Sequence, residues 1–386
     1  MKNKKEACRK LFKEAGIEIN GTKPWDIQVH NERFYSKIMS IKSGGSLALG
    51  ESYMDGWWDA KSLDQFFFKL TSKKPKIKVI SPGIILEIIA NSFINFQSKK
   101  RSKKVAQRHY DLGNDFYKKM LDKYMQYTCG YWKNAKNLNQ AQENKMDLIC
   151  RKLHLKKKNK INKRERILEL GSGFGGFSKF ATEKYNCEIT SYNISKEQIK
   201  YGKEINKNLP VKIIESDYRE AINIEKEGSF DKIVSVGMYE HVGPKNYNTF
   251  MNVAHKCLKN KGLFLLHTIG RQTTLKQGKA DPWIKKYIFP EGHLPSPAEL
   301  ISASEPYFKL EDAHNFGRYY DLTLMAWFDN FEKNWKEFKN KFGDRFYRMW
   351  KYYLLSCAGA FRSGSIDLYQ FVFSKGDLGN VYEAVR

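Results

Sequence analysis

Hydrophobic and polar positions alternate most clearly between residues 166 and 198, where they predict a strand, a glycine-rich loop, a helix and a second strand. Ile167, Leu168 and Leu170 form a short apolar run that stops at Gly171. Apolar residues then recur at helical spacing, and a second apolar-rich β pattern follows. The stretch predicts one βαβ unit, whose ligand edge lies at the carboxyl ends of its strands.

Five further apolar runs have strand character, and helical patterns connect several of them. Together with the first two strands they predict an α/β domain with a seven-stranded sheet. An aromatic stretch at 320–361 follows helical spacing, which is typical of a core helix and suits the wall of an apolar substrate tunnel equally well. The further predicted strands are 211–215, 230–241, 261–270, 307–317 and 366–375.

The first quarter of the chain has a different sequence pattern from the rest. This difference predicts a small accessory domain with a basic linker at 1–105 before a catalytic domain at 106–386. A polar helix is expected within residues 1–23, followed by short aromatic segments that glycines interrupt. Tyr53, Trp57 and Trp58 are interpreted as core residues, because aromatic side chains usually anchor small cores.

An apolar segment at 83–96 precedes five basic residues at 99–104. As a helix it would span about 21 Å, short of the roughly 30 Å hydrocarbon layer of a bilayer. It is predicted to lie in the headgroup region with its basic residues on lipid phosphates, or to be a buried helix followed by a solvated linker.

The formal net charge is +26, and residues 1–108 hold 22 basic and 10 acidic residues of the 68 and 42 in the chain. This dense basic surface is suited to nucleic acid or an anionic bilayer, and general solubility is the plainer explanation. The six cysteines form no C-x-x-C pair, so neither a metal site nor a disulfide framework is indicated. The basic start lacks an apolar core behind it, so we expect no signal peptide and a cytoplasmic protein.

The glycine loop alone identifies no single cofactor. A dinucleotide site calls for an acid at the end of the second strand, which here ends in Ser191, Tyr192 and Asn193. The acids lie instead at Glu169 and Asp217. This layout favours S-adenosylmethionine, whose sulfonium, adenine and zwitterionic tail call for carboxylates and aromatic faces. A nicotinamide or flavin cofactor remains the alternative.

Two later predicted strands end in polar side chains, one in Glu240 and His241 and the next in His267. The carboxyl ends of parallel strands share one edge, so Glu240 and His267 are expected beside the glycine loop. Tyr127, Cys129 and neighbouring aromatic residues fit no periodic core face, which predicts a loop folded over a pocket. Residues 271–307 are rich in proline and are interpreted as an insertion that covers the site.

A series of motifs resembles the family of cyclopropane-fatty-acyl-phospholipid synthases and mycolic-acid cyclopropane synthases. The resemblance runs from about residue 24 to the end, and the amino-terminal unit favours the phospholipid branch. It implies a class I S-adenosylmethionine-dependent methyltransferase fold, Rossmann-like, with a small amino-terminal accessory domain. The motifs are, in chain order, HYDLGNDFY, MQYTCGYW, LELGSGFGG, VGMYEHVGPKNY, LLHTIG, DPWIKKYIFPEG, YYDLTLMAW and SCAGAFR.

The resemblance implies transfer of the donor's one-carbon group to a cis double bond of an acyl chain in a membrane phospholipid. It implies a bound bicarbonate as the base. It also implies an enzyme that acts at the inner face of the membrane, without a nucleic acid partner and as a possible homodimer. For the base it points to Glu240, His267 and Tyr320, with main chain from Cys129 and Ile269. The residues that it marks for the donor are Tyr127, Thr128, Glu169, Gly171, Gly173, Gly175, Asn193, Ile194, Gln198, Asp217, Tyr218 and Arg219.

The resemblance also marks Cys357 as a catalytic candidate. The reaction needs no covalent enzyme intermediate, so a small packing residue near the substrate is the favoured interpretation. Ser172 and Phe174 depart from the cysteine and tryptophan common in the family, and both are compatible with donor binding. Two other functions stay open, a nucleic-acid methyltransferase and a non-catalytic lipid-binding module.

Overall fold

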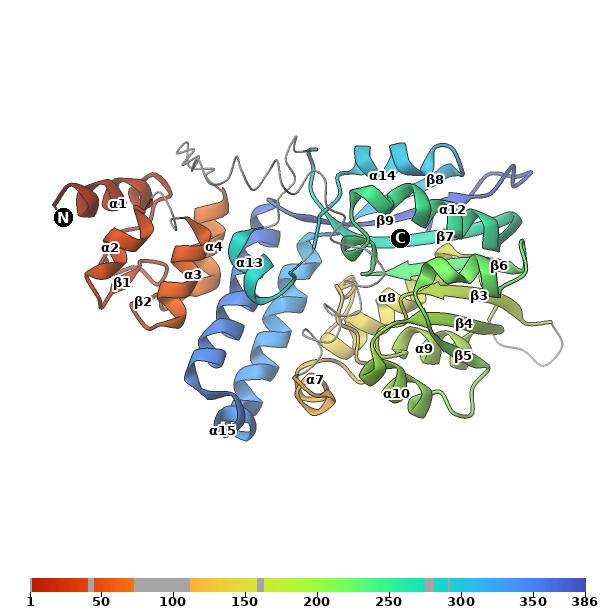
Figure 1. Ribbon diagram of the computed structural model, residues 1–386, viewed down its shortest axis with the longest axis horizontal. Helices are drawn as coiled ribbons and strands as arrows, with labels where there is room; N and C mark the ends of the chain where they lie inside the picture. Colours follow the sequence, from red (N-terminus) through yellow and green to blue (C-terminus); the bar gives the residue numbers. More distant parts are fainter. Residues whose placement is uncertain (1, 41–44, 73–111, 158–162, 275–280, 291) are drawn as a thin grey trace. The chain divides into compact units, whose positions relative to one another are not determined.

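The computed structural model describes residues 2–40, 45–72, 112–157, 163–274, 281–290 and 292–386. The chain divides into two compact units, each assembled from three separate stretches of sequence (Figure 1). The helical unit comprises Met1–Asn95, Lys276–Pro290 and Tyr320–Ile366. The sheet unit comprises Phe96–Leu275, Glu291–Tyr319 and Asp367–Arg386.

The sheet unit contains a seven-stranded sheet in the order β5-β4-β3-β6-β7-β9-β8. All neighbouring pairs from β5 to β7 are parallel, and β9 runs antiparallel to both of its neighbours. The chain reverses its direction of travel across the sheet at β3, which is the switch point where open α/β sheets bind ligands. The strands are β3 Glu165–Leu170, β4 Cys187–Asn193, β5 Val211–Glu215, β6 Phe230–Val236, β7 Leu258–Gly270, β8 Lys309–Asn315 and β9 Asp367–Ser374.

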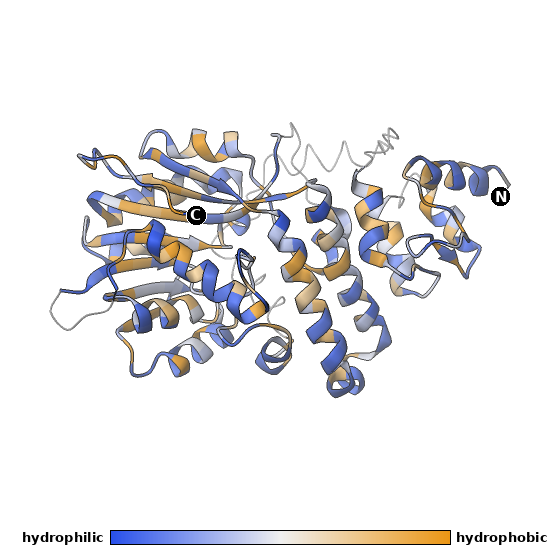
Figure 2. Ribbon diagram, turned by 180° about the vertical axis from the view of Figure 1, so that it is seen from behind, coloured by the Kyte–Doolittle hydropathy of each residue, from blue (hydrophilic) through white to orange (hydrophobic). Residues whose placement is uncertain are grey.

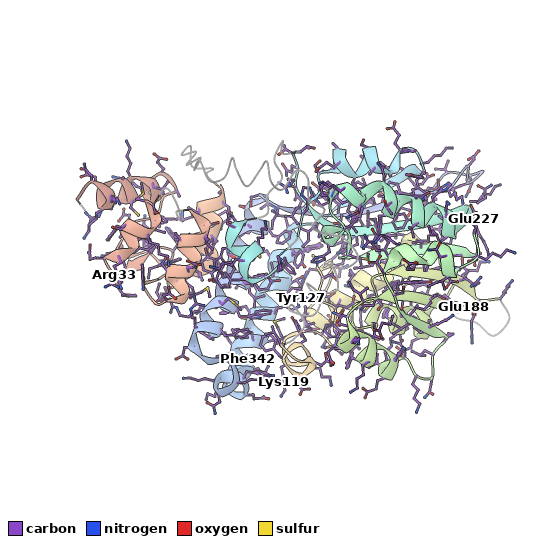
Figure 3. All side chains as sticks on the ribbon, in the orientation of Figure 1. Arg33, Lys119, Tyr127, Glu188, Glu227 and Phe342 are labelled. Carbon is purple, nitrogen blue, oxygen red and sulfur yellow. The ribbon has the colours of Figure 1, made fainter. Side chains whose placement is uncertain are left out.

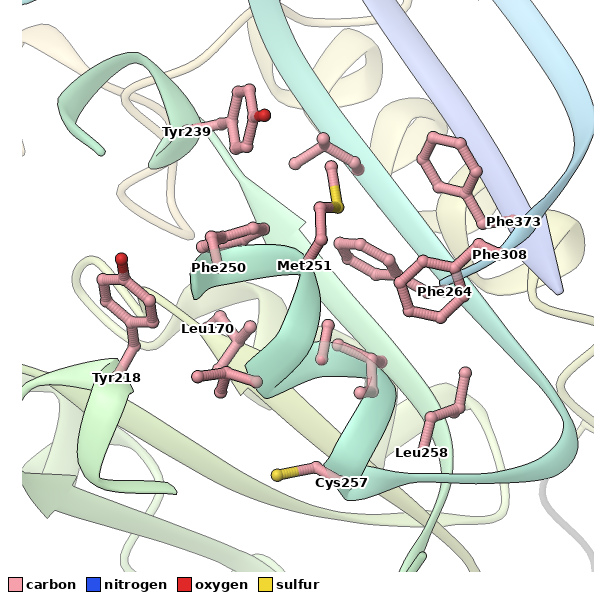
Figure 4. Close-up of a cluster of buried hydrophobic side chains, with 14 of the residues drawn as sticks. Leu170, Tyr218, Tyr239, Phe250, Met251, Cys257, Leu258, Phe264, Phe308 and Phe373 are labelled. Atoms are coloured by element: carbon pink, nitrogen blue, oxygen red, sulfur yellow. The ribbon is translucent and has the colours of Figure 1, made fainter. Parts of the chain in front are cut away.

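Helices cover both faces of this sheet, because the central strands are apolar on both sides (Figure 2). Residues of α12 and α14 pack on one face, where Phe250 and Phe264 lie within a large aromatic cluster (Figure 4). Residues of α8 and α9 pack on the other face. The helices of the unit are α7 Asn114–Met120, α8 Leu138–Lys152, α9 Gly176–Lys184, α10 Lys196–Ile205, α11 Ala221–Ile224, α12 Tyr247–Cys257 and α14 Pro297–Ser304.

The helical unit has an aromatic core in which Trp58 contacts Phe34, Tyr53 and Phe66. The long helix α15 is divided at Gly343, whose φ of 74° is the left-handed conformation that glycine adopts most readily. Its first two residues belong to the sheet unit. The elements are α1 Lys2–Glu14, β1 Gln28–Val29, α2 Arg33–Ile38, α3 Ser46–Met54, β2 Trp58–Asp59, α4 Leu63–Ser72, α13 Pro282–Tyr287 and α15 Arg318–Ser363.

The predicted α/β class and the seven strands are confirmed, and two details of the prediction are wrong. The strand expected at 230–241 ends at Val236, because Gly237 has a φ of 68° and turns the chain into the short 3₁₀ helix η2, Tyr239–His241. Tyr53 and Trp58 are buried as expected, whereas Trp57 is half-buried and lies under the ammonium of Lys37.

Three sequence predictions lie outside the described residues. They are the apolar segment at 83–96, the basic run at 99–104 and the domain boundary at 105. The division at 1–105 and 106–386 therefore stays a prediction. Within the described part of the chain, no helix is both long and apolar enough to cross a membrane.

Candidate active site

The glycine loop joins β3 to α9 at the switch point of the sheet. Gly171 and Gly175 have φ values of 88° and 81°, which residues with a Cβ rarely adopt. A Cβ on Gly176 would lie 1.8 Å from the carbonyl oxygen of Tyr124. The loop therefore lets the segment after Tyr124 approach the amino-terminal end of α9 closely.

Asn193, at the end of β4, ties the glycine loop to the next helix. Its Nδ2 donates to the carbonyl oxygen of Gly173 at 2.9 Å and to Oε1 of Gln198 at 3.1 Å. Its Oδ1 accepts from the amides of Ile194 and Ser195 at 2.7 and 3.0 Å. The structure thus brings four of the residues expected at the donor together, and their role toward a donor stays a prediction.

Asp217 follows the end of β5 and is held by Arg219. The Arg219 guanidinium donates two hydrogen bonds of 2.7 Å, one to each carboxylate oxygen. The hydroxyl of Tyr218 is buried without a hydrogen-bond partner among the described residues, and burial raises its pKa. These three predicted donor residues therefore form one unit at the same edge of the sheet.

Glu169 is buried in β3 and accepts a hydrogen bond of 2.5 Å from the hydroxyl of Ser178 on α9. Burial raises the pKa of the Glu169 carboxyl to about 7, while Ser178 and the charge of Lys145 oppose the shift. This carboxyl supports the contact between strand and helix, and its predicted role at the donor is not tested by that contact.

Residues 126–129, which we call the strap, begin beside the end of the glycine loop, where a Cβ on Gly176 would lie 2.8 Å from Nε2 of Gln126. Figure 3 labels Tyr127 of the strap. The ring of Tyr127 packs edge-on against Tyr117, with centroids 5.5 Å apart. A Cβ on Gly237 would lie 2.5 Å from the Thr128 methyl group, so the strap lies at the end of β6. Cys129 is fully buried. Residues 126–132 form neither helix nor strand, as the predicted loop requires, and the pocket expected beneath this loop stays a prediction.

Glu240 lies on η2, one turn beyond β6, and is 6% exposed. Its Oε1 accepts from the amide of Ile269 at 2.7 Å, so η2 is fixed to the end of β7. Its Oε2 is buried without a hydrogen-bond partner among the described residues. Burial raises the pKa of the carboxyl to about 7, and the amides of Ile269 and Glu240 and the side chain of Thr268 oppose the shift. The Ile269 amide therefore orients Glu240, and its expected contact with an anion stays a prediction.

His267 is fully buried in β7, in register with Val236 at the end of β6. Burial lowers the pKa of its imidazole well below the usual value, and the charges of Lys145 and Lys152 add to the effect. Nδ1 lies 3.3 Å from Nε2 of Gln370. With this amide as the donor, the neutral ring carries its proton on Nε2, which has no partner among the described residues. His267 can therefore donate to a ligand and Glu240 can accept from one.

The two remaining candidates belong to the helical unit. Tyr320 is 6% exposed and its ring stacks on Phe361, with centroids 4.4 Å apart. Cys357 is half-buried on the second arm of α15. Burial first, and then the charge of Asp281, raise the pKa of its thiol to about 12. The raised pKa argues against a thiolate nucleophile, and the place of both residues in the site stays a prediction.

Part of the proline-rich insertion lies beside Glu240. The amide of His293 donates to the Glu240 carbonyl at 2.8 Å, and Nε of Arg271 donates to the Leu294 carbonyl at 2.8 Å. These contacts anchor the turn before α14 at the same edge of the sheet. These contacts do not show that the insertion covers the site, so that part stays a prediction.

Sequence reasoning missed Gln370, Gln142 and Lys145. Gln370 is a buried polar residue in β9, and the other two contact the strap from α8. A signal was present, because Lys145 falls three residues after Gln142 and four before Ile149, on the apolar stripe of the helix. A lysine at such a position needs a specific partner.

The sequence model of the mycolic acid cyclopropane synthetase family matches residues 97–371. Cyclopropane-fatty-acyl-phospholipid synthase of Escherichia coli strain K12 is 46% identical over 379 residues, which are 96% of this chain and 93% of that protein. Among solved structures, cyclopropane synthase MmaA2 of Mycobacterium tuberculosis aligns with a TM-score of 0.64 at 26% identity, over 71% of this chain and 98% of that one.

Mycolic acid cyclopropane synthase CmaA1, solved with SAH and CTAB, aligns with a TM-score of 0.62 at 27% identity, again over 71% of this chain and 98% of that one. The predicted class I methyltransferase fold is thereby confirmed. The chain is an S-adenosylmethionine-dependent methyltransferase and belongs to the mycolic acid cyclopropane synthetase family.

Proposed function

We propose that this enzyme converts cis double bonds in the acyl chains of membrane phospholipids into cyclopropane rings. The observation that carries the proposal is a pair of buried atoms at the carboxyl edge of the sheet, Oε2 of Glu240 and Nε2 of His267, for which the described part of the chain supplies no hydrogen-bond partner. The 46% identity to the E. coli synthase supports the choice of substrate.

The glycine loop and Asn193 lie where the methyl donor is expected to bind. When bound, S-adenosylmethionine supplies an electrophilic methyl carbon that adds across the double bond, and one proton of that carbon is then lost to close the ring. An alkene is a weak nucleophile, so fixed positioning has to supply much of the rate, and it can contribute about 7 to 11 kcal/mol. Tyr127 and Thr128 on the strap are the residues that would orient the donor.

The residues at the edge fit a bicarbonate ion as the base. Nε2 of His267 can donate to one of its oxygens, and Oε2 of ionised Glu240 can accept from its hydroxyl. When bound, bicarbonate would supply the oxygen that takes the proton. Tyr320 and the main chain of Cys129 would complete its ligands. Because Glu240 and His267 are buried, they also exclude water, which would otherwise capture the developing positive charge.

The membrane surface is the other expected partner. The net charge of +26 would draw the enzyme to anionic headgroups, at the inner face of the membrane. Surface attraction of this kind is screened over about 8 Å at physiological ionic strength. Binding to vesicles that contain anionic lipid should therefore weaken as salt is added, and equal binding to neutral and anionic vesicles at all salt concentrations would contradict this part of the proposal.

Mass spectrometry tests the reaction directly. The purified full chain is incubated with S-adenosylmethionine and vesicles of a phospholipid with cis-unsaturated chains. We expect acyl chains heavier by about 14 mass units, with no remaining double bond, because one CH₂ group is added across it. Unaltered fatty acids would overturn the proposal. Methylated RNA in a parallel reaction would favour the nucleic-acid alternative.

A further inference from the structure

Lys145 is a fully buried lysine on α8, directly behind the strap. Its Nζ donates to Oγ1 of Thr128 at 3.0 Å and also to Oε1 of Gln126. Gln142, one turn earlier on the same helix, donates from Nε2 to the carbonyl oxygen of Thr128 at 2.7 Å. Two side chains of α8 therefore hold Thr128 by both its hydroxyl and its carbonyl.

The charge of Lys145 has an unusual environment. A buried ammonium normally pairs with a carboxylate, because an isolated charge is costly to remove from water. Among the described residues, no carboxylate lies within ion-pair distance of Nζ, and both hydrogen-bond acceptors are neutral. Burial lowers the pKa of Lys145 to about 8, against the opposing charges of Asp122 and Glu169.

Lys152 provides an internal comparison. It lies two turns further along the same face of α8 and is also fully buried, with a pKa that burial lowers to about 8. Its Nζ pairs with Asp312 at 3.0 Å, and Asp312 is in turn held by Arg386. Lys152 thus has the contacts of a structural ion pair, whereas the hydrogen bonds of Lys145 go to residues of the strap.

We propose that Lys145 is a positioning residue for the methyl donor: through Gln126 and Thr128 it holds the strap in the conformation that presents Tyr127 to the donor. This inference rests on the proposed assignment of the strap to the donor site. Lys145 itself is buried behind Thr128 and acts through it. Gln142 holds the carbonyl oxygen of Thr128, which belongs to the peptide bond that joins Thr128 to Cys129.

The test compares Lys145→Met with Lys152→Met in the full chain. Both variants remove a buried ammonium and keep the aliphatic stem, so both are expected to lower the melting temperature. Isothermal titration with S-adenosylmethionine should give a dissociation constant raised by about tenfold or more in Lys145→Met and by less than about twofold in Lys152→Met. In turnover assays the KM for the donor should rise more than kcat falls, which a loss of stability alone does not produce.

Gln126→Met provides a second route that leaves Lys145 in place and keeps the test decisive if Lys145→Met fails to fold. It should raise the same dissociation constant by about threefold. The Lys145→Met/Gln126→Met double variant should bind the donor no more weakly than Lys145→Met alone, because Lys145→Met already removes the contact with Gln126 that Gln126→Met breaks. Donor affinity within about twofold of the native value in Lys145→Met, or in Gln126→Met where only that variant folds, would overturn the inference. Native protein that binds the donor but leaves lipids unaltered would instead overturn the proposed function.

Discussion

The carboxyl edge of the sheet and the Arg362 cluster of the helical unit differ in how their polar groups are paired: the cluster pairs partly buried charges, and the edge holds buried atoms without partners among the described residues. Arg362 donates to both oxygens of Asp321 at 2.8 and 2.9 Å and to Asp64 at 2.7 Å. At the sheet edge, Oε2 of Glu240 and Nε2 of His267 are buried without partners among the described residues. An unpartnered buried group costs about 1–3 kcal/mol, so the edge gives up stability that the Arg362 cluster retains. The difference indicates that the edge is built for a ligand and the cluster for folding.

Glu240→Gln should have the largest effect on turnover. The amide keeps the size of the side chain and can still accept from Ile269, but it has no charge with which to bind the anion's hydroxyl. Turnover should fall about 100-fold or more, the usual contribution of acid–base catalysis, while the dissociation constant of the donor changes by less than about threefold.

Glu299→Gln is the matched control for this variant. Glu299 closes the capping box of α14 in the same unit, and an amide oxygen can replace its contact with the Ser296 amide. Its turnover should stay within about twofold of the native value. Equal turnover in Glu240→Gln and Glu299→Gln would remove the base from the proposed mechanism.

Tyr320→Phe should lower turnover by about tenfold or more, because it removes one hydroxyl proposed to hold the base. Donor affinity should be unchanged, since Tyr320 is not among the residues expected at the donor. Tyr352→Phe removes a hydroxyl from another buried tyrosine of the helical unit and should leave turnover within about twofold. A Tyr320→Phe enzyme as active as Tyr352→Phe would exclude Tyr320 from the site.

The pH dependence follows from the raised pKa of Glu240, which is about 7. Below that value the carboxyl is protonated, so kcat/KM at a constant bicarbonate concentration should fall by up to about tenfold per pH unit. The stability effect has the opposite sign, because the folded chain binds this proton more tightly than the unfolded chain does. The contribution of Glu240 to the free energy of unfolding is full below the ordinary value of 4.5 and is lost as the pH rises through about 7.

Denaturant unfolding at several pH values, beside the rate measurements, checks both signs. Between pH 4.5 and about 7, the free energy of unfolding of the native protein should include a decrease that is due to Glu240. The Glu240→Gln protein should lack this decrease. The decrease of kcat/KM on the acid side should have its midpoint near pH 7. A midpoint more than roughly one pH unit lower would show that Glu240 is not the group that titrates.

Arg362→Met tests the other half of the comparison. It should lower the free energy of unfolding by about 2 kcal/mol, because two partly buried carboxylates lose their charged donor. Arg345→Met breaks the more exposed ion pair with Asp55 and should cost less than about 1 kcal/mol. Denaturant unfolding followed by tryptophan fluorescence measures both. Equal costs would mean that burial does not strengthen the Arg362 contacts.

The sequence predicted what depends on periodicity. The apolar runs of β3, β5, β7 and β9 and the glycine loop between β3 and α9 were recoverable, because strand period and glycine conformation leave local traces. The end of β6 was not, because the left-handed turn at Gly237 depends on the close approach of Thr128 from a distant segment. Such tertiary contacts determine where a strand ends, and the residues next to that point in the sequence give little indication of it.

The site was predicted in part for the same reason. Strand order predicted that Glu240 and His267 lie at one edge, as they do, and their role in catalysis stays a prediction. The role of the Ile269 amide as the donor that orients Glu240 was not predicted, since a main-chain contact leaves no mark in the side-chain pattern. Lys145 was missed because a lysine in a helix is normally exposed, and only its place on the apolar stripe distinguished it.

Cys357→Ala should have the smallest effect, with turnover lowered by less than about threefold. Burial raises the thiol pKa to about 12, so the sulfur is almost wholly protonated at neutral pH and is a poor nucleophile. Replacing it removes one sulfur atom from a half-buried position, and the loss should appear as a slightly lower melting temperature. Cys257→Ala, at a fully buried thiol far from any proposed role, is the control for that packing loss. A drop in turnover of about 100-fold in Cys357→Ala alone would restore the thiol as a catalytic group, because packing loss would act on both variants.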